Sequence, residues 1–356
     1  MPPTVLDWSP TVDPSEFVRR VREALAAGRV VVFPGDSGYV ALADPTSPVA
    51  PELPAPAVLA YGPDDAAKMG LAVPTVARRL MFRSWPAPLT VALPADPASP
   101  PAGWPAPLWE RLAAGGRVRF RCPDHALTDA LLPALPGPVV VSDTFLPTAT
   151  AAAERVGEVV ELAVSAGELR AERRPTEVAV TDAGWQVTEQ GDFPAEEVQR
   201  LAARIVLFVC TGNTCRSPLA EGLAKALLAE RLGCSAADLP ARGVWVLSAG
   251  VAAYGGGPAS PLAADAAAEF GADLTDHRSR PVNPQLLAAA DDVIAMTHAH
   301  AHALAARYPG VGPGVRLLCG DADLDDPIGA GPDVYRDCAR AIRGHLGRFL
   351  PEWVRE

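Results

Sequence analysis

The chain has 356 residues, of which 49% are hydrophobic and 21% are charged, and its formal net charge is −11. This length exceeds one ordinary hydrophobic core, so we expect two globular domains. The negative charge argues against a nucleic-acid-binding or anionic-membrane surface, because such surfaces concentrate positive charge. No uncharged apolar run reaches about 18 residues, so we expect no membrane span.

The cysteines and the first residues of the chain bear on its compartment. The six cysteines show neither a Cys-x-x-Cys pair nor zinc spacing: they are Cys122, Cys210, Cys215, Cys234, Cys319 and Cys338. In a chain of this length, such scatter favours reduced thiols over a disulfide framework. Residues 1–8 lack the basic stretch and the apolar run of a signal peptide. We therefore expect a cytoplasmic protein.

The first half holds most of the 38 prolines and has few long helical patterns. A helix is predicted over residues 14–27, where Phe17, Val21 and Leu25 recur at helical spacing and Gly28 follows. Apolar runs predict strands at residues 30–33, 57–61, 89–93, 118–121 and 139–142.

The second half alternates strands and helices regularly. It follows a polar, proline-containing boundary at residues 191–197 and a predicted linker helix at 198–203. The predicted strands are 205–209, 244–248, 292–296 and 315–318, and the predicted helices are 218–231, 260–270, 298–307 and 333–350. This order predicts an open, four-stranded parallel sheet with helices on both faces. We thus expect an α/β protein with domains at residues 1–197 and 204–356.

The most informative segment joins the first of these strands to its helix. Its residues, 210–217, read Cys-Thr-Gly-Asn-Thr-Cys-Arg-Ser. A tight loop before a helix N-terminus directs backbone N–H groups at an anion, and Arg216 adds a planar fork for two phosphate oxygens. Cys210 alone would suggest a small buried hydrophobe. With an arginine six residues later, the pattern predicts transfer of a phosphoryl group to sulfur.

Residues 209–218 closely resemble the active-site loop of the low-molecular-weight protein tyrosine phosphatases. Further motifs follow in family order: Ser248-Ala249-Gly250, Asp276-His277-Arg278-Ser279-Arg280, Ala295-Met296-Thr297 and Asp325-Asp326-Pro327-Ile328-Gly329. The resemblance covers residues 204–353. It implies a cysteine-dependent protein phosphatase that acts on phosphorylated protein substrates, without a metal or a cofactor.

The resemblance also implies residue roles. Cys210 attacks phosphorus, Arg216 holds the phosphoryl oxygens, and Asp326 protonates the leaving group and then activates water. Asn213 and Ser217 brace the loop and hydrogen-bond the nucleophile. The full set of loop residues expected to support the phosphate is Thr211, Gly212, Asn213, Thr214, Cys215 and Ser217. Cys215 has two open interpretations: a disulfide partner that protects Cys210 from over-oxidation, or packing.

Other polar residues near these motifs are expected to be less important. Asp325 has at most a supporting role in the family pattern, and Asp321 and Asp323 are predicted to be solvated loop charges. His298, His300 and His302 recur at a spacing of two, which does not suit a metal site on one helical face.

The substrate class depends chiefly on Thr214. Members that act on phosphotyrosine typically have an aliphatic residue at that position and aromatic rings just after the Asp-Pro pair, where this chain has Ile328-Gly329. The threonine variant resembles the protein-arginine phosphatase branch, although that branch usually has phenylalanine where Ile328 stands. We expect protein phosphoarginine to be the substrate, with phosphotyrosine as the alternative.

Two alternatives are disfavoured. Thiol-coupled arsenate reductases share this fold but need two closely spaced cysteines downstream, and residues 259–282 contain none. A phospho-residue binding module without activity would require the loss of Cys210, Arg216 or Asp326, and all three are present.

Residues 14–192 resemble, more distantly, the YrdC-type threonylcarbamoyl-AMP synthases. The matching segments are 32–39, 84–90, 117–125 and 175–178. This implies a twisted-sheet α/β domain around a nucleotide cavity. However, the family's phosphate-gripping Lys-x-x-Arg helix is replaced by the proline-rich residues 45–56, and its Ser-x-Asn triplet reads Ser142-Asp143-Thr144. We expect a degenerate domain that is a scaffold, binds a small ligand or docks the substrate protein; an active synthase, which would make the chain bifunctional, is the less favoured alternative.

Overall fold

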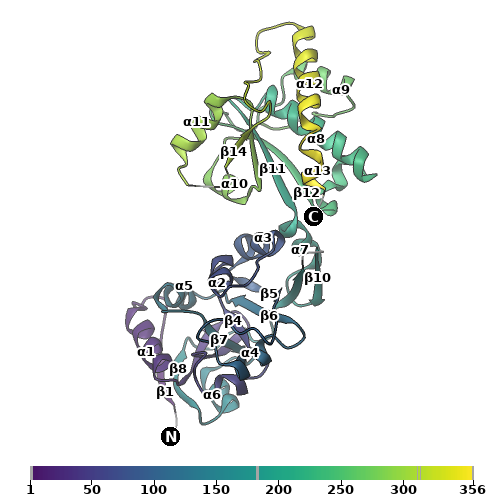
Figure 1. Cartoon of the computed structure of the whole chain (residues 1–356). Helices are drawn as coiled ribbons and strands as arrows, with labels where there is room; N and C mark the ends of the chain where they lie inside the picture. The colour runs from purple at the N-terminus through teal and green to yellow at the C-terminus, as the bar shows by residue number, and fades with distance from the viewer. Residues whose placement is uncertain (1–2, 182–183, 311, 313, 355–356) are drawn as a thin grey trace. The chain divides into compact units, whose positions relative to one another are not determined.

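The computed structural model describes residues 3–181, 184–310, 312 and 314–354, and its contacts divide the chain into two compact units, Met1–Leu201 and Ala202–Glu356. Each unit combines a β-sheet with helices, which confirms the predicted α/β class (Figure 1). Within the described residues, no helix is both long enough and apolar enough to cross a membrane.

The first unit is built on a ten-stranded mixed sheet with the order β1-β8-β2-β3-β7-β4-β6-β5-β9-β10. The strands are β1 (Thr4–Asp7), β2 (Val30–Gly35), β3 (Gly38–Ala43), β4 (Ala57–Leu59), β5 (Ala87–Pro94), β6 (Arg117–Cys122), β7 (Val139–Asp143), β8 (Val160–Ser165), β9 (Thr176–Thr181) and β10 (Gly184–Glu189). Pairings such as β2 with β3 are antiparallel, whereas β2 with β8 and β5 with β9 are parallel.

Short helices accompany this sheet. They are α1 (Ser15–Ala26), α2 (Pro63–Lys68), α3 (Thr75–Ser84), α4 (Ala106–Leu112), α5 (Ala126–Leu131), α6 (Ala149–Val156) and α7 (Ala195–Ala202), with 3-10 turns at Ala50–Glu52 and Leu132–Ala134. The apolar face of α1 places Val21 and Leu25 in one core cluster with Val31 and Phe33 of β2. This packing explains why the helical spacing of apolar residues was visible in the sequence.

The five strands predicted for this half all exist, but β1, β3, β8, β9 and β10 were not predicted. β3 follows β2 after only two residues, Asp36 and Ser37, so the pair reads as one apolar run with a turn inside it. β10 is largely exposed and therefore lacks the buried alternation that marks a strand. The linker helix, α7, begins three residues earlier than predicted.

The second unit contains a four-stranded sheet with the order β12-β11-β13-β14, in which every pairing is parallel, as predicted. Its strands are β11 (Arg204–Cys210), β12 (Val244–Gly250), β13 (Asp292–Ala295) and β14 (Val315–Leu317). The central strand, β11, is buried along its last five residues. A continuous apolar run of this kind is typical of a parallel strand that is covered on both faces.

Helices cover both faces of this sheet, which confirms the predicted layering (Figure 1). The elements are α8 (Arg216–Leu232), a 3-10 segment (Ala236–Arg242), α9 (Pro261–Glu269), α10 (Pro284–Ala289), α11 (His298–Arg307), α12 (Pro332–Leu346) and α13 (Leu350–Trp353). Val206 and Phe208 of β11 pack in a cluster with residues of α8 and α12. Leu207 and Val209 face the other way, into a cluster with Leu287 of α10 and Leu304 of α11.

Three helical features of this unit differ most from the predicted ones. α8 begins at Arg216 rather than at residue 218, so the arginine is the first residue of the helix. The predicted final helix is two helices, because α12 ends at Leu346 and α13 begins at Leu350. The short helix α10 was not predicted; it begins at Pro284, and Asn283 caps it through a bond to the backbone N–H of Leu286.

Candidate active site

The loop that joins β11 to α8 encloses the sulfur of Cys210. β11 ends at Cys210, and α8 begins at Arg216 with Pro218 in its first turn, where a missing N–H costs nothing. Asn213 has a φ of +54°, the left-handed conformation that asparagine tolerates better than most residues. The loop also lies close against Gly250 at the end of β12, since a Cβ at that position would come within 2.5 Å of the Thr211 carbonyl oxygen.

Two hydrogen-bond donors point at the sulfur. The hydroxyl oxygen of Ser217 lies 3.0 Å from the Cys210 Sγ, and the backbone N–H of Asn213 donates to the same sulfur at 3.3 Å. The Asn213 side-chain amide donates to the Ser217 hydroxyl oxygen at 2.9 Å. The Ser217 proton then has two acceptors within reach, the sulfur at 3.0 Å and the Ala249 carbonyl oxygen at 3.4 Å, of which the sulfur is the nearer. Two donors beside a helix N-terminus suit a negatively charged sulfur.

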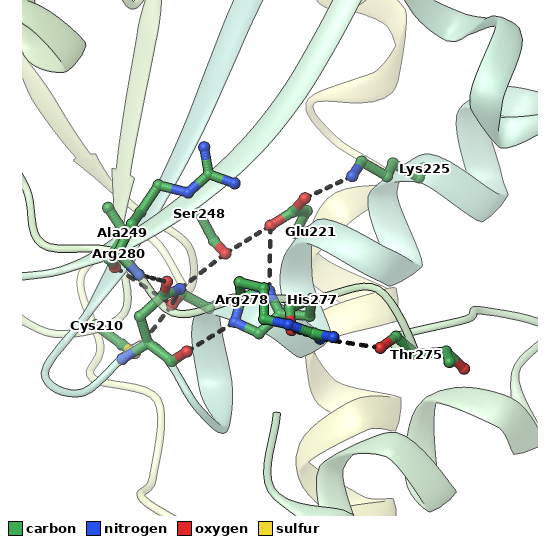
Figure 2. Close-up of polar contacts among 11 residues, drawn as sticks. Cys210, Glu221, Lys225, Ser248, Ala249, Thr275, His277, Arg278 and Arg280 are labelled. Atoms are coloured by element: carbon green, nitrogen blue, oxygen red, sulfur yellow. Dashed lines mark hydrogen bonds and ion pairs between the residues drawn. The ribbon is translucent and has the colours of Figure 1, made fainter. Parts of the chain in front are cut away.

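A chain of buried polar groups extends this arrangement away from the sulfur (Figure 2). The Asn213 amide also donates to the Ser248 hydroxyl at 2.8 Å, and Ser248 donates to a carboxylate oxygen of Glu221 at 2.6 Å. Lys225, one helical turn along α8, donates to the other oxygen of Glu221. Because Glu221 accepts the Ser248 proton and the Asn213 amide donates to both hydroxyl oxygens, the direction of the bonds is fixed from Glu221 to the oxygen of Ser217.

The segment after α9 hydrogen-bonds to the side-chain oxygen and the backbone carbonyl oxygen of Asn213. The backbone N–H of Arg280 donates to the Asn213 side-chain oxygen at 2.8 Å, and His277 Nε2 lies 2.8 Å from the Asn213 carbonyl oxygen. His277 Nδ1 is also 3.9 Å from Glu221 (Figure 2). The strained turn at Asn213 is thus held at its backbone and at both ends of its amide group.

Arg216 and Asp326 form an ion pair across this loop. The Arg216 side chain is only 7% exposed, and one of its nitrogens donates to an oxygen of Asp326. Another donates to the carbonyl oxygen of Leu324 at 3.3 Å. The Asp326 side chain is 41% exposed, so it remains open to a substrate. The structure therefore places the cysteine loop beside the Asp-Pro segment that lies more than a hundred residues further along the chain.

The second unit is similar to known proteins. A family model described as "Low molecular weight phosphotyrosine protein phosphatase" matches residues 205–356. A protein-arginine-phosphatase from Bacillus subtilis (strain 168) is 40% identical over 136 residues, which are 37% of this chain and 84% of that protein. The chain belongs to this phosphatase family.

Two further relatives illustrate the range of the family. A probable low molecular weight protein-tyrosine-phosphatase from Ralstonia solanacearum is 31% identical to this chain over 150 residues. The match covers 42% of this chain and 94% of that protein. The solved structure of an arginine phosphatase from Geobacillus stearothermophilus is 32% identical in sequence to this chain. The match covers 42% of this chain and 92% of the solved one, with a TM-score of 0.36. By sequence, the chain is similar both to a protein named for arginine and to one named for tyrosine.

The second loop cysteine of the phosphatase has polar neighbours. Its sulfur lies 3.3 Å from the hydroxyl of Tyr335 on α12 and 3.4 Å from that of Ser260. Cys215 and Cys210 are both free thiols in this structure. The backbone N–H of Ser260 donates to the Thr214 carbonyl oxygen at 2.8 Å, and the Thr214 hydroxyl is 3.7 Å from the Cys215 sulfur. Thr214 itself is half-buried at the edge of the loop.

The structure adds residues that the sequence did not single out. Glu221 and Lys225 support the loop. In the sequence, the one hint of this role was an acidic residue one helical turn before a lysine on the predicted helix. Tyr254 is 93% exposed on residues 251–260, a segment whose two ends bond to the phosphatase loop at the carbonyls of Cys210, Thr211 and Thr214.

Asp323 is an exposed loop charge, as expected, and it also has a partner on α11. Its carboxylate accepts bonds from the backbone N–H and from Nδ1 of His298, both at 2.7 Å. Asp323 thereby holds the first turn of α11, and these bonds lower the pKa of its carboxyl group. Across the described ranges, histidine, cysteine and acidic side chains form no cluster of three or more that could hold a metal ion.

Proposed function

We propose that this phosphatase hydrolyses protein phosphoarginine through a phosphocysteine on Cys210. The observation that carries the proposal is the Cys210 sulfur with two directed donors, next to the buried Arg216 and its partner Asp326. The family supplies the reaction class, the family resemblance implies the individual roles, and the geometry supports them.

In the first step, the Cys210 thiolate attacks phosphorus. The S–P bond forms as the bond from phosphorus to the guanidinium nitrogen breaks, and Asp326 gives its proton to that nitrogen. Arg216 and the loop N–H groups hold the phosphoryl oxygens as their charge redistributes. Those oxygens compete with Asp326 for the fork of Arg216, so substrate binding frees the carboxyl group for proton transfer.

In the second step, water attacks the phosphocysteine. Asp326, now a carboxylate, takes one proton from the water, the O–P bond forms and the S–P bond breaks. The products are inorganic phosphate and the restored thiolate. Ser217 stabilises the departing sulfur, because the sulfur is the nearer of the two acceptors of its hydroxyl proton and gains negative charge in this step.

Three observations support arginine as the substrate residue. Thr214 puts a polar group at the edge of the loop, Ile328 takes the place of an aromatic ring after the Asp-Pro pair, and the relative from Bacillus subtilis is named an arginine phosphatase. The competing candidate is phosphotyrosine, which the exposed ring of Tyr254 favours because it could stack on a phenol.

Replacement of Thr214 by isoleucine is expected to shift the ratio of kcat/KM for a phosphoarginine peptide to that for a phosphotyrosine peptide by about tenfold or more towards phosphotyrosine. The physical reason is that isoleucine removes the polar contact for a phosphoguanidinium and adds apolar surface for a ring. The measurement compares wild-type and variant enzyme on two peptides with identical flanking residues.

The same kinetics test the proposal itself. A higher wild-type kcat/KM on the phosphotyrosine peptide would overturn the arginine assignment, and an unchanged ratio in Thr214→Ile would remove the reason given for it. Turnover of neither peptide would overturn the proposed function as a whole.

For the first unit, we infer a degenerate synthase-like domain that binds a small ligand but does not form the adenylate. The connection over residues 45–56 contains only a 3-10 turn and neither lysine nor arginine. Arg121 is buried and paired with Asp36 at 2.7 Å and with Asp143, so its charge is already neutralised. A cavity of about 420 Å³ beside Asp143 and Thr144 has room for a small ligand.

The full-length protein is accordingly expected to release no pyrophosphate from ATP in the presence of threonine and bicarbonate. The reason is that the two cationic phosphate contacts of the synthases are missing. A coupled pyrophosphate assay, with Arg121→Gln as a second sample, checks this. Threonine-dependent release by the wild-type chain that is lost in Arg121→Gln would show an active synthase instead.

A further inference from the structure

A buried imidazole connects α11 to the second residue of the cysteine loop. His300 is 5% exposed, and its Nε2 lies 2.9 Å from the hydroxyl oxygen of Thr211. Its Nδ1 lies 2.8 Å from the hydroxyl oxygen of Thr297, the residue that caps the start of α11. The same Thr297 oxygen accepts the backbone N–H of His300 at 3.3 Å. The mechanism derived above does not use this side chain.

The charge state of His300 follows from its surroundings. Burial lowers the pKa of the imidazole, and the positive charge of Arg216 on α8 lowers it further. Asp326 and Asp323 act in the opposite direction, but less strongly than these two causes. At neutral pH the ring is therefore uncharged, with one nitrogen that donates a hydrogen bond and one that accepts.

The hydroxyl of Thr297 determines which ring nitrogen of His300 carries the hydrogen. Thr297 is buried, and its oxygen already accepts a bond from the His300 backbone. In the described part of the chain, the one acceptor within reach of its proton is Nδ1 of His300. A buried hydroxyl proton without an acceptor is costly, so Thr297 donates to Nδ1 and the ring hydrogen lies on Nε2. Nε2 then donates to the Thr211 oxygen.

This assignment fixes the direction of the Thr211 hydroxyl. Since its oxygen accepts the bond from Nε2, its own proton must point away from His300. Thr211 is exposed, directly follows Cys210, and has its carbonyl oxygen held by the backbone N–H of Ala252 at 3.0 Å. The proton is therefore available at the open side of the anion-binding loop.

We propose that His300 is a positioning residue that directs the Thr211 O–H towards an oxygen of the bound phosphoryl group. The proposal rests on the assignment of the Cys210 loop as the phosphoryl-binding site. The chain of bonds runs from Thr297 through His300 to Thr211 and ends on the substrate. Protonation of His300 would break the link to Thr297, because Nδ1 would then carry a proton that faces the Thr297 proton. It would also place a second positive charge near Arg216, whereas Nε2 would still donate to Thr211.

The kinetic test uses the full chain and compares four variants. Thr211→Val and His300→Leu are each expected to lower kcat/KM on the phosphoarginine peptide about tenfold, the effect of one hydrogen bond to a charged acceptor. Combining them should cost no more than either alone, because both break the same chain. His300→Gln keeps an N–H near the position of Nε2 and should retain more activity than His300→Leu.

A matched control lies on the same helix. His302 is exposed and outside the bond chain, so His302→Leu should leave kcat/KM unchanged. Losses that multiply in the double variant, or a Gln variant as poor as the Leu variant, would overturn the positioning role. If His300→Leu does not fold, Thr211→Val and His300→Gln still distinguish these outcomes.

A second readout does not depend on turnover. The ¹⁵N signals of His300 in the labelled wild-type chain should show a protonated Nε2 and an unprotonated Nδ1 at neutral pH, and the tautomer should be lost as the pH falls well below 6.5, the ordinary pKa of histidine. A protonated Nδ1 or a charged ring at neutral pH would contradict the proposal even if the enzyme hydrolyses phosphoarginine. Failure of the proposed function alone would leave this spectrum unchanged.

Discussion

Replacing Cys210 by serine is expected to reduce turnover of any phosphorylated substrate by at least about 10⁴-fold. The serine hydroxyl is not ionised near neutral pH, so the attacking group is lost, whereas the sulfur of Cys210 has two donors that suit a thiolate. Oxygen is smaller than sulfur and can keep the bonds from Ser217 and Asn213. The variant should therefore still bind inorganic phosphate, measured by calorimetry, with an affinity within about threefold of the wild-type value.

The matched control is Cys234→Ser. Cys234 is a partly buried free thiol just beyond the end of α8 and outside the loop, so its replacement should leave kcat/KM essentially unchanged. Appreciable turnover by Cys210→Ser would show that the nucleophile lies elsewhere. Loss of phosphate binding in the same variant would mean that the substitution damaged the loop rather than the chemistry.

Replacing Asp326 by asparagine is expected to lower the rate on phosphopeptides by about 10²–10⁴-fold, the usual contribution of a general acid. The effect should depend on the leaving group. p-Nitrophenolate leaves without a proton, so formation of the phosphocysteine from p-nitrophenyl phosphate should slow by less than about tenfold. Release of phosphate from that intermediate still needs the carboxylate as a base, and a burst of p-nitrophenol should precede a slow steady state.

Stopped-flow measurement of p-nitrophenol checks this, with Asp325→Asn as the neighbouring control. Asp325 is exposed, and in the structure it is Asp326 that bonds to Arg216. An equal loss of rate in both variants would mean that the negative charge of the loop matters, rather than proton transfer by Asp326. An equal slowing of phosphocysteine formation from both substrates by Asp326→Asn would exclude the acid role.

The parts of this site that are local in sequence could be predicted from the sequence. β11, its loop and α8 follow one another within thirty residues, and a buried strand before an anion-binding turn has a strong pattern. Asp326 is different: it meets Arg216 only through the fold, and the family resemblance, not spacing, pointed to it. Glu221 and Ser248 were missed as a pair for the same reason, since their contact joins a helix to a different strand.

The fold was predicted best where strands are buried. β11 and β13 read as apolar runs, and the four-stranded sheet was recognised from them. In the first unit, the edge strands β1 and β10 contain no buried residue and carry no such pattern, so these two were not foreseen. The contact of Asp323 with the first turn of α11 was not foreseen, because tertiary structure brings the two together.

The most direct test of the account is to trap the phosphorylated enzyme. Asp326→Asn is mixed with p-nitrophenyl phosphate, quenched within the burst, and analysed by mass spectrometry of the peptide that contains Cys210. The account predicts one phosphate on Cys210, close to one per enzyme molecule, and none when Cys210→Ser is combined with Asp326→Asn. A phosphate on any other residue, or a burst without a phosphorylated enzyme, would contradict it.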